Sequence, residues 1–356
     1  SIRAREPSVN TDNAAGGVEY SDAYLYDNDA RFVFNFVRTS MNYGCVAANY
    51  VESTGAVRED AIWKVSARDN ISGEEFQIRA KAMVNACGPY VDKHNQLANQ
   101  KTEHRHLLSK GIHLIVDRIA EGDRILAFFA SDGRLFFVIP MGNKTSIGTT
   151  DIQVDSPDVE VTAEDRKFVL DNINALLRLN KPITEEDIIA ERCGVRPLAL
   201  KGGDGVADWV KLSRKHAIDV SHEDQHLSIF GGKTTDCINV GNEVAEIIKA
   251  MGIELPFDDF KWYGEDDDTV RDEFYHQAKL MDLDVYTVKG SSEPLTQRLW
   301  RRYGGNALEL LEDIRRDPGK AQRLMKDAEY LRCEVEHTGR HEMVTKLEDF
   351  LRRRWK

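Results

Sequence analysis

This sequence of 356 residues lacks several features that define large protein classes. It contains no run of about 18 apolar residues, so no membrane-spanning helix is predicted. A formal net charge of -12 argues against a general nucleic-acid binder. The five cysteines include no C-x-x-C pair, which favours a cytosolic, reducing compartment. The remaining composition, 41% hydrophobic and 8% aromatic, is typical of a globular protein with a large core.

Two nucleotide-binding motifs are also missing. A Walker A loop requires glycine at position 227 ahead of Gly232-Lys233-Thr234, but Leu227 is found there, which excludes a nucleoside triphosphatase on spacing. No strand is followed by G-x-G-x-x-G and a helix, so the dinucleotide fingerprint of a doubly wound enzyme is not found.

The strongest local signal lies between Leu227 and Met251. Leu227 to Phe230 predicts a buried strand, and Gly231-Gly232 allows a sharp turn or close approach to a ligand. A helix is expected next, because Thr234, Thr235 and Asp236 are good N-cap residues and apolar residues then recur at helical spacing. The free N–H groups of such a helix suit an anionic or electron-rich ligand, although an ordinary strand-to-helix connection explains the stretch equally well.

Periodicity predicts the remaining elements, which form three successive segments. The first begins with a helix at Asp27–Gly44 and a strand at Cys45–Val51. A hairpin follows at Ala61–Ala67 and Glu75–Ile78, then a strand at Lys81–Ala86 and a helix at Val91–Leu97. The second is an antiparallel sheet with one helix, at Gly111–Val116, Ile125–Ala130, Leu135–Pro140, Thr145–Thr150, Thr162–Leu179 and Ile188–Leu198. The third, after an acidic linker near Pro256, is helical, at Val270–Leu280, Pro294–Tyr303, Ala307–Arg316, Lys320–Glu334 and Glu342–Arg353.

Three basic residues and one histidine are candidates for a ligand site. Arg196, Arg214 and Lys233 lie in or beside strands and turns that an α/β sheet could bring together, and Arg196 sits on a stiff segment that suits a fixed guanidinium fork. A partly buried ion pair is the alternative explanation for Arg196. His113 lies in an apolar strand, where it is either a hydrogen-bonded core residue or a general base.

Other histidines give weaker signals. His104 and His106 flank Arg105 in a polar stretch that is interpreted as a solvated loop. Cys333, His337 and His341 are four residues apart and could share one helix face as zinc ligands do. Because Gly339 interrupts that helix and no fourth ligand is apparent, we predict no metal.

Seven stretches, in order, resemble the FAD-dependent glycerol-3-phosphate dehydrogenase family of the aerobic type. They are YSDAYLYDNDARFVFNFV (20–37), VNACGPY (84–90), KGIH (110–113), FVIPMGNKTSIGTT (137–150), GVRPL (194–198), SR (213–214) and FGGKTT (230–235). The C-terminal EMVTKLEDFLRRR (342–354) is similar to that family's helical tail. No stretch matches the family's N-terminal strand, its G-x-G-x-x-G and the flavin loop that follows, so the resemblance predicts a chain that begins partway through the family protein.

The resemblance implies an α/β fold with α+β elements. It would combine part of an FAD/NAD(P)-binding doubly wound domain, an antiparallel-sheet substrate domain and a C-terminal helical domain. The corresponding segments are the remainder of the FAD-binding domain (1–102), the substrate-binding sheet (103–193), a return to the FAD-binding domain (194–255) and the helical cap (256–356).

The resemblance also implies roles for individual residues. Arg196, Arg214, His113 and Thr234 would bind sn-glycerol 3-phosphate, and His113, Arg196 and Lys233 would take part in catalysis. The residues expected to hold FAD are Val46, Ala86, Cys87 and Gly88 on the adenosine side, and Gly231, Gly232, Lys233, Thr234 and Thr235 over the flavin ring.

The expected reaction is oxidation of sn-glycerol 3-phosphate to dihydroxyacetone phosphate, with hydride passing to flavin N5 and His113 or a neighbouring base taking the C2 hydroxyl proton. Electrons would then pass to quinone, with the protein bound at the cytoplasmic face of the inner membrane. A homodimer is compatible with the resemblance. The alternatives are an oxidase that uses oxygen, a non-catalytic fragment, and a related flavin-dependent amine or amino-acid oxidase. Flavin absorption and turnover of glycerol 3-phosphate against amino acids would distinguish them.

Overall fold

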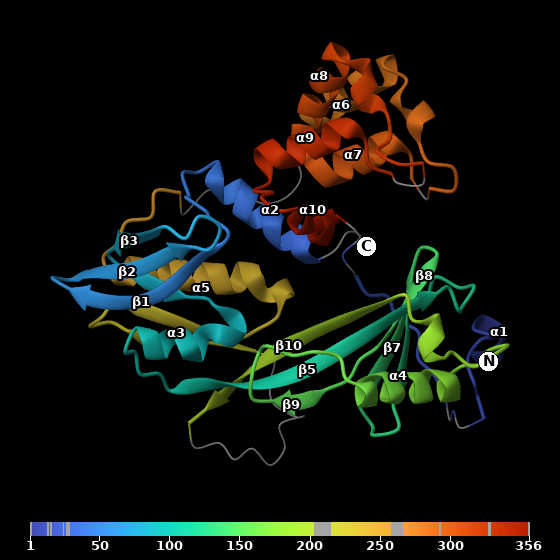
Figure 1. Cartoon of the computed structure of the whole chain (residues 1–356), viewed down its shortest axis with the longest axis horizontal. Coiled ribbons are helices and arrows are strands. Elements are labelled where there is room, and N and C mark those ends of the chain that lie inside the picture. The colour runs from blue at the N-terminus through green and yellow to red at the C-terminus, as the bar shows by residue number, and fades with distance from the viewer. Residues whose placement is uncertain are drawn as a thin grey trace. The chain divides into compact units, whose positions relative to one another are not determined.

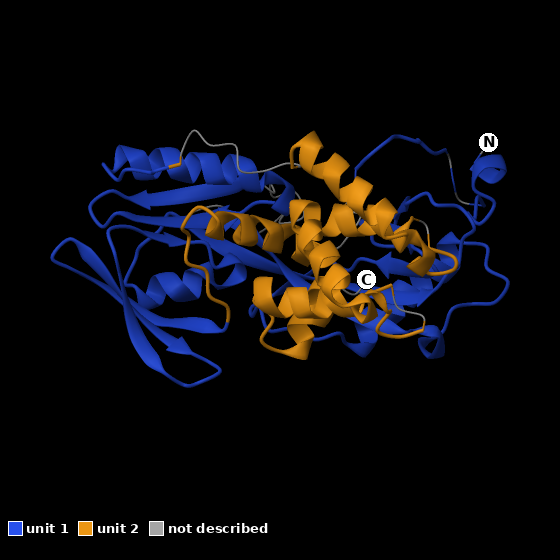
Figure 2. Ribbon diagram, turned by 90° about the horizontal axis from the view of Figure 1, so that it is seen from above, with its two compact units in different colours: residues 1–23, 50–256 blue, residues 24–49, 257–356 orange. Residues whose placement is uncertain are grey.

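The computed structural model describes residues 2–12, 14, 16–23, 25, 29–202, 215–257, 266–291, 293–326 and 329–354. Figure 2 shows two compact units, one made of residues 1–23 and 50–256 and the other of residues 24–49 and 257–356. The division into four segments predicted from the resemblance stays a prediction. Within the described residues, no helix is both long enough and apolar enough to cross a membrane.

A small antiparallel sheet lies near one end of the first unit (Figure 1). Its order is β1 (Val51–Glu59), β2 (Ile62–Asp69) and β3 (Glu75–Ala80), so the predicted hairpin is confirmed and a third strand joins it. The predicted strand at Cys45–Val51 is wrong. Tyr50 has a φ of 59°, which interrupts an extended backbone, and regular pairing begins only at Val51.

The second sheet contains the central stretch. Its order is β11 (His216–Ser221), β12 (His226–Gly231) and β4 (Met83–Asn85), with β12 antiparallel to β11 and parallel to β4. β4 leads through a short 3-10 turn into α3 (Val91–Leu97), and β12 leads through a 3-10 turn at Thr234–Asp236 into α5 (Cys237–Ala250). The strand and helix expected around Gly231-Gly232 are therefore confirmed.

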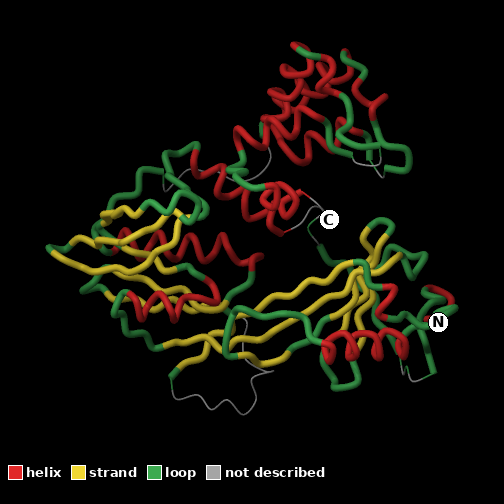
Figure 3. The backbone as a smooth tube through the Cα atoms, viewed as in Figure 1, coloured by secondary structure: helices red, strands yellow, loops and turns green. Residues whose placement is uncertain are grey.

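The third sheet is antiparallel, as predicted. It runs β10 (Ala190–Lys201), β5 (His104–Asp117), β8 (Lys144–Gly148), β7 (Leu135–Met141) and β6 (Leu126–Phe129), and β9 (Ile152–Val154) also pairs with β5. Figure 3 shows the long strands of this sheet in yellow. β5 begins well before its predicted start at Gly111, and β10 begins at Ala190 and continues past its predicted end at Leu198.

One face of this sheet is covered by α4 (Ala163–Leu176). The helix starts as predicted, because Thr162 Oγ1 accepts from the Asp165 N–H and the Asp165 carboxylate accepts from the Thr162 N–H. Ile112 and Leu114 from β5 pack in the core with Val169 and Ile173 of α4. The short helix α1 (Ile2–Arg5) belongs to the same unit.

The second unit is helical. It contains α2 (Asp29–Met41), α6 (Asp268–Leu280), α7 (Leu295–Tyr303), α8 (Ala307–Arg316), α9 (Arg332–His341) and α10 (Leu347–Arg354). Its core includes a buried ion pair in which Arg298 donates from both terminal nitrogens to Glu334, each at 2.8 Å.

The predicted helix at Lys320–Glu334 is wrong. The structure has a 3-10 turn at Pro318–Ala321, and α9 begins only at Arg332. The Glu334 carboxylate explains this start, because it accepts from the Leu331 N–H at 2.7 Å and so caps a new helix N-terminus. The predicted interruption at Gly339 is also wrong, since α9 continues through it to His341.

Candidate functional site: an arginine fork and two glycine turns

The register of β5 and β10 places two predicted site residues, Arg196 and His113, and a second arginine, Arg192, on one face of the large sheet. Arg196 lies opposite Ser109, Gly194 opposite Gly111, and Arg192 opposite His113. Side chains alternate between faces along a strand, so Arg196, Arg192 and His113 share a face. Ile112, which alternates with them, belongs to the core under α4, so these three residues lie on the face that α4 leaves uncovered.

The Arg196 guanidinium is held in a fixed position on this face. Nη2 donates to Thr149 Oγ1 at 2.8 Å, and Nη1 donates to the Thr150 carbonyl at 3.3 Å. Its Nη1 also lies 3.5 Å from an Asp151 carboxylate oxygen. The side chain remains 32% exposed, so the fork is oriented by the protein and still accessible to a ligand.

Gly111 makes room for this fork. A Cβ at position 111 would lie 2.4 Å from Nη2 and 2.7 Å from Nη1 of Arg196. Such separations are far shorter than ordinary contacts, so the guanidinium occupies space that any other residue would fill. Glycine is therefore required at position 111 to leave room for the guanidinium, a requirement that the sequence alone did not reveal.

His113 is neutral at physiological pH. Burial, followed by the positive charges of Arg196 and Arg192, lowers the pKa of His113 from 6.5 to about 4. A neutral imidazole can accept a proton, which is the form that a general base requires. The side chain is only partly buried, which fits a residue at the edge of a site.

The second part of the site is formed by the ends of two parallel strands. β4 and β12 run in the same direction, with Asn85 opposite Ser228, so the turns that follow them lie at the same sheet edge. Ala86, Cys87 and Gly88 follow β4, and the turn starting at Gly231 follows β12. In α/β sheets this carboxyl edge is where ligands bind.

Both turns have conformations that favour glycine. Gly88, Gly231 and Gly232 have φ values of 54°, 65° and 88°. A Cβ on Gly231 would lie 3.2 Å from Ala199 Cβ, so the turn is seated against β10, the strand that also carries Arg196. After the glycines, Lys233, Thr234 and Thr235 are exposed and offer an ammonium group and two hydroxyls.

His106 is a part of this region that sequence reasoning missed. The Gly231 N–H donates to His106 Nε2 at 3.0 Å, and the His106 side chain is 1% exposed. Burial lowers the pKa of His106, which keeps Nε2 available as an acceptor. The predicted solvated loop is wrong because β5 begins at His104. The alternation of His104, His106 and Leu108 with the residues between them was a usable signal for a longer strand.

Two other predicted site residues lie outside the described part of the first unit. Arg214 lies outside the described residues. Val46 belongs to the second unit, where its side chain is 94% exposed. Their expected roles stay predictions.

Comparison with known proteins identifies the class that this fold and site represent. Residues 1–231 match the family described as "FAD dependent oxidoreductase", and residues 193–356 match the "C-terminal domain of alpha-glycerophosphate oxidase". The chain belongs to the FAD dependent oxidoreductase family. The α/β fold with a C-terminal helical domain, and the resemblance noted above, are thereby confirmed.

Curated relatives of the chain include two bacterial glycerol-3-phosphate dehydrogenases. The chain is 28% identical to "Glycerol-3-phosphate dehydrogenase 2" of Mycobacterium tuberculosis over 98% of its own length and 58% of the relative's. It is also 28% identical to "Aerobic glycerol-3-phosphate dehydrogenase" of Staphylococcus haemolyticus, covering 98% of this chain and 63% of that one. The chain thus spans about three fifths of the length of these relatives.

A solved structure shares the fold. The glycerol-3-phosphate dehydrogenase from Bacillus halodurans, complexed with FAD, superposes with a TM-score of 0.71 at 24% identity, covering 99% of this chain and 68% of that chain. The exposed turns at the carboxyl edge of β4 and β12 fit a flavin nucleotide, because they combine glycines with a cation and hydroxyls at an edge that binds ligands.

Proposed function

We propose that this chain takes part in the FAD-dependent oxidation of sn-glycerol 3-phosphate to dihydroxyacetone phosphate. The observation that carries the proposal is the Arg196 fork, oriented by Thr149 and Thr150 beside a neutral His113. A planar guanidinium binds phosphate through two parallel hydrogen bonds, which matches the charged end of this substrate.

Substrate binding would change the basicity of His113. Two of the causes that lower the pKa of His113 are the charges of Arg196 and Arg192. A bound phosphate would offset these charges and raise the pKa of His113 toward its ordinary value. His113 would therefore become a better acceptor for the C2 hydroxyl proton only when the substrate phosphate is in place.

The two glycine turns are the proposed FAD contacts. Ala86, Cys87 and Gly88 would contact the adenosine side, and Gly231, Gly232, Lys233, Thr234 and Thr235 would cover the flavin ring. When bound, FAD supplies the acceptor for the hydride that leaves C2. The Lys233 ammonium would favour negative charge on its ligand, and His106 would hold the Gly231 turn in position through the 3.0 Å hydrogen bond.

The acceptor of the electrons is proposed to be quinone at a membrane surface. The match of residues 193–356 to a domain of an oxidase favours oxygen as the second candidate. Hydrogen peroxide release during turnover in air would support the oxidase, whereas reduction of a quinone analogue without peroxide would support the dehydrogenase.

Replacement of Arg196 tests the phosphate fork. Arg196→Ala in the FAD-loaded protein is expected to raise the KM for sn-glycerol 3-phosphate by roughly 10- to 150-fold, since a hydrogen bond to a charged group contributes about 1.5–3 kcal/mol. Arg166→Ala is the matched control, because Arg166 belongs to α4 and is paired with Glu191, whose neighbour across the strands, Leu114, packs in the core with α4. An unchanged KM in Arg196→Ala would refute the assignment of Arg196 as the phosphate fork.

A further inference from the structure

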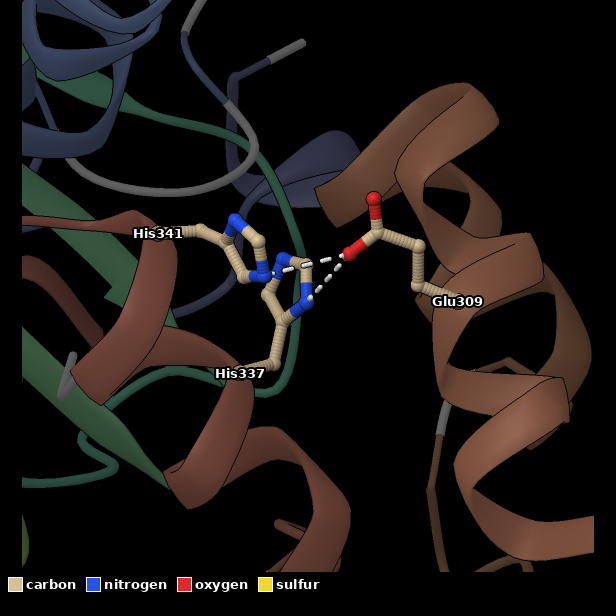
Figure 4. A group of neighbouring side chains, drawn as sticks. All are labelled: Glu309, His337 and His341. Carbon is tan, nitrogen blue, oxygen red and sulfur yellow. Dashed lines mark ion pairs between the residues drawn. The ribbon is translucent and has the colours of Figure 1, made fainter. Parts of the chain in front are cut away.

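Two helices of the second unit bring together a carboxylate and two imidazoles. Glu309 lies in the first turn of α8, and His337 and His341 lie four residues apart in α9, on the same face of that helix. Figure 4 shows the three side chains pointing toward one another. One ligand atom from each residue can be chosen so that all lie within 4.8 Å of one another.

The spacing of these atoms fits a small divalent cation. Glu309 Oε2 lies 3.6 Å from His337 Nδ1 and 3.2 Å from His341 Nε2. Bonds of about 2.0–2.1 Å in a tetrahedral zinc site place neighbouring ligand atoms roughly 3.3 Å apart. Both separations are close to that value, and the nitrogens of the two histidines lie within 4.8 Å of each other, so side-chain rotations can bring all three ligand atoms to one ion.

The surroundings favour a cation over three separate surface groups. The His337 side chain is 4% exposed, and its ring meets the Tyr303 ring edge-on at 5.3 Å, which fixes its orientation. The His337 and His341 rings lie 4.6 Å apart with an interplanar angle of 31°, so both imidazoles can reach one ion. The positive charge of Arg340, which lies in α9 beside His341, is offset by ion pairs with Glu336 and Asp313.

We propose that Glu309, His337 and His341 bind a divalent transition metal, with Zn²⁺ as the best match. Two neutral imidazoles and one carboxylate are a preferred zinc donor set, and their spacing leaves a fourth position for water. The Glu309 and His341 side chains are 54% and 34% exposed, which gives the ion access from solvent. A bound ion would link α8 to α9.

This ligand set differs from the one considered from the sequence. Cys333 is fully buried in the hydrophobic core of the second unit, and burial raises its thiol pKa to about 12. A thiol in that state is a poor metal ligand. Glu309, from α8, is the third ligand in place of Cys333. The proposal therefore differs from the prediction of no metal made from the sequence.

Metal titration of the chelator-treated protein tests the proposal. Calorimetry with Zn²⁺ at pH 7.5 is expected to show one equivalent bound, and Co²⁺ is expected to give the visible absorption of a tetrahedral site. His341→Ala and Glu309→Gln alter exposed side chains and are each expected to weaken Zn²⁺ binding by at least roughly 100-fold. His276→Ala, at an exposed histidine of α6 in the same unit, is the matched control and should bind as the unaltered protein does.

Two outcomes would overturn the proposal. One is the absence of stoichiometric Zn²⁺ binding, which would leave an ordinary ion pair between Glu309 and the histidines. The other is an affinity in His341→Ala or Glu309→Gln equal to that in His276→Ala. Neither outcome bears on the proposed oxidation, because the titration requires neither FAD nor substrate.

Discussion

Gly111→Ala is expected to weaken substrate binding while leaving the fold intact. The new Cβ would lie 2.4 Å from Arg196 Nη2. Non-bonded heavy atoms prefer separations of about 3.5 Å, so the guanidinium must move by roughly 1 Å. The obstacle is the far end of a flexible side chain, and Gly111 does not have a positive φ, so β5 can accept the new methyl group.

The magnitude follows from the contacts that the movement removes. The fork is oriented by its hydrogen bonds to Thr149 and Thr150, and a shift of this size breaks the 2.8 Å bond to Thr149. If the bond to phosphate is lost as well, about 1.5–3 kcal/mol of binding free energy disappears, which is roughly 10- to 150-fold in Kd. The pKa of His113 should rise at the same time, because the charge of Arg196 moves away from it.

Calorimetry with sn-glycerol 3-phosphate and NMR titration of His113 measure these two effects. Gly194→Ala is the matched control, because Gly194 lies directly opposite Gly111 in the register and nothing lies within 4 Å of its added Cβ. The reasoning is refuted if Gly111→Ala binds substrate as tightly as Gly194→Ala does, whether or not both variants bind it more weakly than the unaltered protein.

Three further predictions concern stability and the flavin turn. Unfolding free energy should fall as the pH drops from 6.5 to about 4, because the pKa of His113 and that of His226 are each lowered to about 4 and only the unfolded chain takes up their protons in that window. Urea unfolding at pH 7.5 and pH 5 measures this change. Arg298→Met should lower the unfolding free energy by about 3–5 kcal/mol, since it leaves the Glu334 carboxylate buried without its partner. Gly231→Ala should weaken FAD binding, measured by flavin fluorescence, because the φ of 65° and the nearby Ala199 oppose a Cβ.

Controls from the same chain make these predictions refutable. Equal stability at pH 7.5 and pH 5 would show that the two histidines do not resist protonation in the folded state. Arg352→Met removes an exposed ion pair and should cost less than about 1 kcal/mol, so an equal loss from Arg298→Met would contradict the buried-pair argument. Gly241→Ala adds a Cβ with nothing within 4 Å and should leave FAD affinity unchanged. Equal FAD affinity in Gly231→Ala would exclude the turn as a flavin contact.

Local patterns allowed much of the fold to be predicted. The start of α4 depends on Thr162 and Asp165, three residues apart, and the helix N-terminus after Gly231-Gly232 depends on a similarly short stretch. The antiparallel alternation of the large sheet is also local. These features are readable because the interacting groups are neighbours in the sequence.

Long-range relationships were the part that sequence could not supply. The hydrogen bond from Gly231 to His106 spans 125 residues, and the fit of the Arg196 side chain over Gly111 depends on the register of β5 and β10. Tyr50 adopts a left-handed conformation that the residues around it do not predict, so the strand predicted at Cys45–Val51 does not form ahead of Val51. In the same way, Glu309 joins the two histidines of α9 only through helix packing.

The most direct test of the proposed oxidation is a visible absorption spectrum of the FAD-loaded protein without oxygen, before and after addition of sn-glycerol 3-phosphate. We predict that the absorption of oxidised flavin disappears with this substrate and persists with glycine or proline. A protein that retains FAD and keeps the oxidised spectrum at saturating sn-glycerol 3-phosphate would contradict the account.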